Sequence, residues 1–109
     1  MTWTVRASVA PTTVHRKHYA TITTTIKASG AKTALIDVEI YASNGKKVAQ
    51  KSWSSATFKA GVTRTFKWSW YVGSTRATGR YTVKVGIFEP AWSKLLNWHN
   101  ASAAFRVAV

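Results

Sequence analysis

The chain has 109 residues, of which 46% are hydrophobic, which suits one globular domain and excludes a disordered segment. It contains no cysteine, which excludes disulfides, thiol catalysis and thiolate metal sites. Sixteen lysines and arginines stand against three acidic residues, and a net charge of +13 attracts polyanions. The alternative is that the charge serves only solubility or adapts the protein to an acidic medium. The apolar runs are too short for a membrane span.

Apolar and polar residues alternate with period two along almost the whole chain, which predicts β-strands. The first strand ends before Pro11, and the second carries threonines on its polar face. The third ends near Asn44-Gly45, a pair that predicts a type I′ hairpin turn because both residues adopt positive φ readily. The predicted strands in chain order are residues 3–9, 20–27, 36–41, 47–53, 62–70, 79–88 and 103–109.

Two loops divide the later strands. Residues 73–79 read as a polar loop, and residues 89–100 read as a long loop with one helical turn near residues 92–96. About seven strands without a convincing helix or internal repeat predict an all-β fold, an immunoglobulin/fibronectin-III-like antiparallel β-sandwich. We expect a single domain over residues 1–109, cut from a larger multidomain secreted protein, because the pattern starts and stops inside strands.

The residues for catalysis or metal binding are scarce. Asp37 and Glu39 share one strand face, where we expect them to be solvated and balanced by lysines, and Glu89 stands apart. His15 and His18 flank two basic residues, a poor environment for a metal cation. We therefore expect no catalytic residue, no metal site and no cofactor, and thus no enzyme.

The six tryptophans carry the main functional signal, because sugar rings stack their apolar faces on indole rings. Trp3 and the alternating Phe66, Trp68 and Trp70 are assigned to the core. The candidate ligand-binding residues are Trp92 and Trp98 in the long loop, Trp53 at a strand end, and Lys94 and Asn97 as hydrogen-bonding groups, with His99, Tyr41 and Phe88 as further members. The alternative is that Trp92 and Trp98 fold back and close the open end of the sandwich.

Several stretches resemble a small accessory β-sandwich module of secreted bacterial glycoside hydrolases. They are residues 37–50, 60–70, 79–88 and 90–100, so the resemblance covers roughly residues 35–109. Its most distinctive part is Gly86-Ile87-Phe88 followed by Pro90, Trp92 and a second tryptophan. The resemblance implies a secreted, monomeric, carbohydrate-binding or accessory module, tethered to a catalytic domain and bound to cellulose, mannan or a similar polysaccharide. This chain is more basic than such modules, which raises the case for an acidic or wall-associated ligand.

Three functions follow from these observations. The first is a non-catalytic carbohydrate-binding module that uses tryptophan stacking. The second is a structural spacer that stabilises a neighbouring domain and binds no ligand. The third is a polyanion-binding module for cell wall, acidic polysaccharide or nucleic acid, with basic strand faces that include Lys47, Lys51, Lys67 and Lys84.

Overall fold

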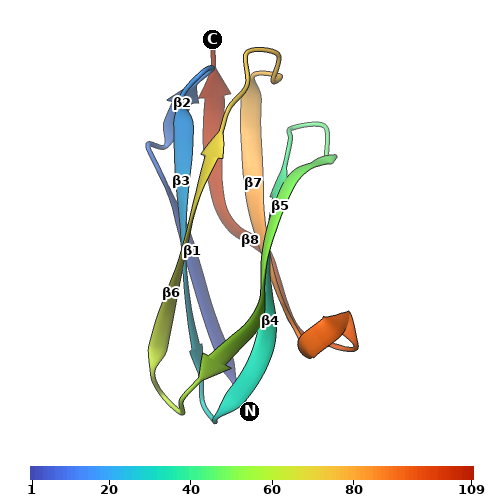
Figure 1. Ribbon diagram of the computed structural model, residues 1–109. Coiled ribbons are helices and arrows are strands. Elements are labelled where there is room, and N and C mark those ends of the chain that lie inside the picture. Colours follow the sequence, from blue (N-terminus) through green and yellow to red (C-terminus); the bar gives the residue numbers. More distant parts are fainter.

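The computed structural model describes residues 1–109, apart from the side chain of Ala101. It is a β-sandwich with eight strands and one short 3-10 helix (Figure 1). The elements are β1 Trp3–Ala10, β2 Thr13–His15, β3 Tyr19–Ala28, β4 Lys32–Tyr41, β5 Lys47–Phe58, β6 Thr63–Tyr71, β7 Gly79–Phe88, η1 Pro90–Trp92 and β8 Leu95–Ala108. No helix in this described part of the chain is long and apolar enough to cross a membrane.

The strands form two sheets, in the orders β1-β3-β6 and β2-β8-β7-β4-β5. All neighbouring strands are antiparallel except β2, which pairs parallel with β8. The chain leaves the first sheet after Ala10, passes Pro11, and joins the second sheet at Thr13. The predicted all-β sandwich is confirmed. The eighth strand, β2, was not predicted because three residues are too few to produce a visible alternation.

The core lies between the two sheets and is built from the apolar positions of each alternation. Ile22, Ile26, Val38 and Val83 are almost fully buried, as the period-two pattern predicts. Aromatic rings fill the wider parts of the core. The ring centroids of Tyr81 and Phe105 lie 5.6 Å apart, those of Trp70 and Tyr81 lie 6.0 Å apart, and those of Phe58 and Phe66 lie 6.2 Å apart. Trp3 and Trp68 are only partly buried against this core.

The predicted loop over residues 89–100 is wrong in its second half. The backbone N–H of Glu89 donates to the carbonyl of Lys94 at 2.8 Å and closes a short turn, after which β8 begins at Leu95. Residues 95–100 were not recognised as strand because polar and exposed side chains occupy both of its faces there. Trp98 therefore stands on a strand of the sheet, and its direction is fixed by the pairing of β7 with β8.

The hairpin between β4 and β5 also differs from the prediction. Gly45 has a φ of 85°, whereas Asn44 is not in the left-handed region, so the turn is not type I′. Instead, the N–H of Ala42 donates to the carbonyl of Lys46, and the Asn44 side chain accepts from the N–H of Lys46. The extra residues are accommodated by an irregular step in the register beside Tyr41.

Candidate functional site

An aromatic cluster lies on the outer face of the five-stranded sheet. We define it as Phe88, Trp92 and Trp98. Its base is Gly86, which pairs with Trp98 across β7 and β8. A Cβ atom added at Gly86 would lie 2.8 Å from Phe88 Cε1 and 2.9 Å from Trp98 Cε3. The two rings thus converge directly over the glycine backbone, and any larger residue at this position would push them away.

The third ring, Trp92, is presented by the turn between β7 and β8. The centroids of Phe88 and Trp92 lie 4.9 Å apart. Ala91 and Trp92 both have a φ of 61°, a left-handed conformation that is unfavourable for residues other than glycine. The Glu89–Lys94 backbone bond, an ion pair between Lys32 and Glu89, and a bond from Ser93 Oγ to the Pro90 carbonyl hold the turn. Such conformations cluster at functional positions.

The aromatic cluster has a buried lower side and an exposed upper side. Leu35 on β4 pairs with Phe88, and η1 packs against β4 and β5. Leu35 is 2% exposed although it is not part of the core between the sheets, so the cluster and η1 cover it. Trp92 and Trp98 remain 45% and 38% exposed. The two tryptophans lie on the outer face of a sheet and leave indole surface open to a ligand.

Next to the aromatic cluster lies a carboxyl pair, Asp37 and Glu39, on the outer face of β4. Asp37 is fully buried and Glu39 is 6% exposed, so the prediction of a solvated acidic face is wrong. The reason is their position in the middle of the sheet. Asp37 pairs with Ser52 on one side and Gly86 on the other, and the ring of Trp98 occupies the space above Gly86.

The polar partners of the carboxyl pair come from its own strand and from β5. Gln50 Nε2 donates to Asp37 Oδ1 at 2.8 Å, and the Tyr41 hydroxyl donates to Glu39 Oε1 at 2.5 Å. Lys47 Nζ lies 3.6 Å from Glu39 Oε2. Asp37 Oδ2 is buried and, if both carboxyls are ionised, has no hydrogen-bond partner among the described residues. A proton on Asp37 that is donated to Glu39 satisfies both groups.

The titration of the pair follows from these contacts. Burial, and then the neighbouring Glu39 carboxyl, raise the pKa of Asp37 to about 7. Burial alone would raise the pKa of Glu39 as well, but hydrogen bonds from Asp37 and Tyr41 and the charge of Lys47 outweigh it and lower that pKa. The bond to Glu39 raises the pKa of Tyr41 to about 12. Below about pH 7 the pair therefore shares one proton, with Asp37 as the donor.

The structure brings some of the predicted site residues together and separates others. Trp92, Trp98 and Phe88 meet in the aromatic cluster, and Lys94 is exposed in the adjoining turn. Trp53 pairs with Ile36, faces the inner side of the sheet and packs on Phe66 at 5.1 Å.

Asn97 pairs with the core residue Ile87 and therefore faces the opposite side of β8 from Trp98. His99 likewise pairs with a core residue, Val85, and its ring is bonded to Ser102. Trp53, Asn97 and His99 thus do not belong to the surface that carries the aromatic cluster.

Tyr41 lies on the same face as the aromatic cluster, at the far end of β4. It lies six positions beyond Leu35, a distance of about 20 Å along a strand. Lys84 Nζ stands 4.2 Å from the centre of its ring, and a hollow opens beside it, lined by Ser43, Arg80 and Thr82 among others. Sequence reasoning missed Gly86 and the burial of Asp37. A glycine inside an otherwise regular strand was the available signal for the close approach of other groups.

No family model and no curated protein matches the chain. Solved structures match its fold. The C-terminal domain of Wzt is 14% identical, with 96% of this chain and 71% of that one covered and a TM-score of 0.75. A CARDB domain from Pyrococcus furiosus, solved in complex with di-metal ions, is 19% identical, with 98% and 88% covered and a TM-score of 0.62.

Two larger proteins contain a similar domain. The Pseudomonas fluorescens alkylpurine DNA glycosylase AlkC, bound to DNA, is 17% identical, with 98% of this chain and 30% of that chain covered and a TM-score of 0.68. The β-glucosidase of Listeria innocua, in complex with laminaribiose, is 13% identical, with 99% and 16% covered and a TM-score of 0.58. At these identities the matches establish the fold alone, which recurs as one domain of several different proteins.

Proposed function

We propose that this domain is a non-catalytic carbohydrate-binding module of a larger secreted protein that acts on polysaccharides. The observation that carries the proposal is the aromatic cluster. Trp92 and Trp98 both expose indole surface, and Phe88 lies next to each of them. The fold of the domain also occurs within a β-glucosidase, which agrees with such a role. A tethered module of this kind raises the local concentration of its partner enzyme at an insoluble substrate.

Sugar binding on this surface uses two kinds of contact. The apolar faces of one or two sugar rings stack on Trp92 and Trp98. Their hydroxyl groups then meet polar side chains at the rim, such as Lys94 in the turn and Gln50 on β5, both of which are exposed. The rings are held from below by Gly86 and Leu35, so little side-chain freedom is lost when a ligand binds.

Retention on insoluble cellulose, mannan, xylan and chitin tests the proposal. We expect at least one of these polymers to retain the protein and to change its tryptophan fluorescence. Trp92→Ala and Trp98→Ala should each weaken retention at least tenfold. Leu95→Ala is the matched control, because Leu95 is also exposed and adjoins the same turn but carries no aromatic ring.

Two results contradict the proposal. One is the absence of retention and of any fluorescence change on all four polymers, which would favour the structural spacer. The other is an equal loss of retention in Leu95→Ala, which would show that general apolar contact, and not ring stacking, holds the polymer.

A further inference from the structure

The outer face of the three-stranded sheet has a regular composition of its own. Its side chains stand in rows that run across β1, β3 and β6, as the strand register shows. We call this surface the basic face. From one end to the other its rows are Tyr19 with Tyr71; Ala10, Thr21 and Ser69; Ser8, Thr23 and Lys67; Arg6, Thr25 and Thr65; and Thr4, Lys27 and Thr63.

The basic face carries cations without carboxylates. Arg6, Lys27 and Lys67 come from three different strands and take part in none of the ion pairs of the described residues. The three acidic residues of the chain lie elsewhere, two on the outer face of the other sheet and Glu89 in the β7–β8 turn. The positive potential of this face is therefore uncompensated locally, and it favours an anionic ligand.

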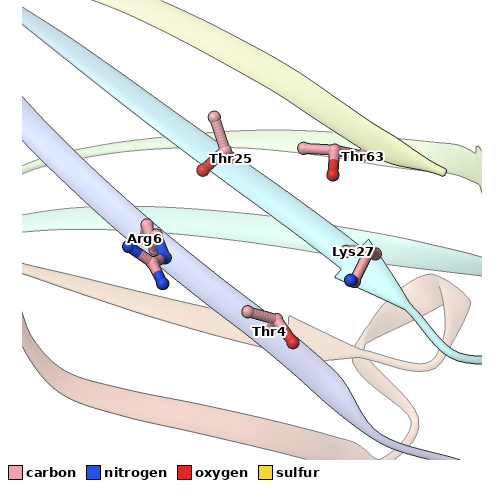
Figure 2. Close-up of a pocket in the computed structure, with 5 residues that line it drawn as sticks. All are labelled: Thr4, Arg6, Thr25, Lys27 and Thr63. Atoms are coloured by element: carbon pink, nitrogen blue, oxygen red, sulfur yellow. The ribbon is translucent and has the colours of Figure 1, made fainter. Parts of the chain in front are cut away.

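A hollow in the basic face brings cations and hydroxyl groups together. Figure 2 shows the side chains around it, which come from β1, β3 and the start of β6. The lining residues are Thr4, Arg6, Thr25, Lys27 and Thr63. Guanidinium and ammonium groups bind carboxylate, sulfate or phosphate oxygens, and threonine hydroxyls both donate to and accept from sugar hydroxyls.

An exposed aromatic pair stands at the other end of the same face. Tyr19 and Tyr71 are opposite each other on β3 and β6, with ring centroids 5.1 Å apart. They are 60% and 47% exposed and contribute nothing to the core. An exposed tyrosine pair beside a row of hydroxyl groups, Thr21 and Ser69, offers one stacking position for a sugar ring.

We propose that the basic face is a second binding surface and that its ligand is an acidic polysaccharide, a polymer of sugars that carry carboxylate or sulfate groups. Single-stranded nucleic acid is less suited to it. Nucleic-acid surfaces stack successive bases on separate aromatic rings. Here the two tyrosine rings contact each other, and the remaining positions of the face offer hydroxyl groups and cations without a further aromatic ring. The surface lies on the opposite sheet from the aromatic cluster, so the two proposals stand independently.

Affinity for heparin, polygalacturonate, neutral dextran and single-stranded DNA, measured at one ionic strength, tests this assignment. The triple variant Arg6→Gln, Lys27→Gln, Lys67→Gln should bind heparin or polygalacturonate at least tenfold more weakly. Its control is Lys46→Gln, Arg80→Gln, Arg106→Gln, which has the same net charge but removes exposed cations from the hairpin and the other sheet. That control should lose less than threefold. The heparin and polygalacturonate arms distinguish sulfate from carboxylate as the recognised group.

The tyrosine pair separates sugar recognition from simple charge attraction. Tyr19→Thr, Tyr71→Thr should weaken binding to the preferred acidic polysaccharide at least fivefold and leave retention on a sulfopropyl resin unchanged. Leu95→Ala, on the opposite sheet, should leave binding to that polysaccharide unchanged. Equal losses in the two triple variants would overturn the proposal in favour of diffuse charge, and so would tighter binding of DNA than of both acidic polysaccharides.

Discussion

The two outer faces of this sandwich differ in how they treat charge and space. On the five-stranded sheet, two carboxyls are buried in the middle of the face, and the rings of Phe88 and Trp98 converge over a glycine with Trp92 beside Phe88. On the three-stranded sheet, threonines and cations stand open in regular rows, and the tyrosine pair lies at one end of the face. The same alternation of apolar and polar residues along a strand can therefore give a partly closed, apolar outer face or an open, polar one. The side chains that neighbouring strands place on that face decide which of the two forms.

The largest expected effect on stability comes from placing a valine side chain on the outer face of each sheet and comparing the two variants. Gly86→Val should lower the free energy of unfolding by about 1–3 kcal/mol, because its side chain would overlap the rings of Phe88 and Trp98. Ser8→Val on the basic face should change it by less than about 0.5 kcal/mol, because Ser8 is exposed. Urea denaturation measures both values. Equal effects of the two substitutions would contradict the close packing of Phe88 and Trp98 over Gly86.

The next effect concerns the buried carboxyl pair. Because the pKa of Asp37 is raised from 3.8 to about 7, the folded state holds this proton more tightly than the unfolded chain does. The associated stability is fully present below about pH 4 and is lost as the pH rises through 7. Asp37→Asn, whose amide replaces the proton donor, should match the parent protein at pH 4 and be more stable at pH 8.

Denaturation curves between pH 4 and pH 8 measure this prediction, and Glu39→Gln is its counterpart. The pKa of Glu39 is lowered, so its stabilising contribution is present above its unfolded-state pKa and is lost in acid. Glu39→Gln should therefore destabilise the protein at pH 8. Trp98→Ala should lower the pKa of Asp37 by admitting water. An Asp37→Asn variant less stable than the parent at pH 8 would show that the ionised carboxylate is the favoured form.

The smallest expected effect is at the turn that presents Trp92. Ala91→Gly should raise the free energy of unfolding by about 0.5–1 kcal/mol, because glycine adopts a φ of 61° without strain. Ala31→Gly, in an exposed loop without positive φ, should lower it slightly. Thermal denaturation compares the pair, and a destabilised Ala91→Gly variant would mean that the left-handed turn carries no strain.

The alternation of apolar residues was sufficient to predict the sandwich and most of its strands, since Ile22, Val38 and Val83 face the core as expected. The aromatic cluster was predicted only in part. Trp92 and Trp98 were recognised, but the convergence of Phe88 and Trp98 over Gly86 depends on the register of β7 and β8, which local sequence does not encode. The same holds for Asp37, whose burial comes from neighbouring strands, and for Tyr19 and Tyr71, which meet only through the pairing of β3 with β6.

The edge position of strand β5 affects whether copies of the domain aggregate at high concentration. It forms one edge of the five-stranded sheet and spans Lys47–Phe58, so its outer backbone groups are a template on which another chain could add a strand. Lys47 and Lys51 lie on this edge, and irregular steps in its pairing with β4 twist it. Two copies that approach side by side meet like charges before their backbones can pair. Like-charge repulsion at this edge therefore keeps the sheets of neighbouring copies from merging into aggregates when the domain is concentrated.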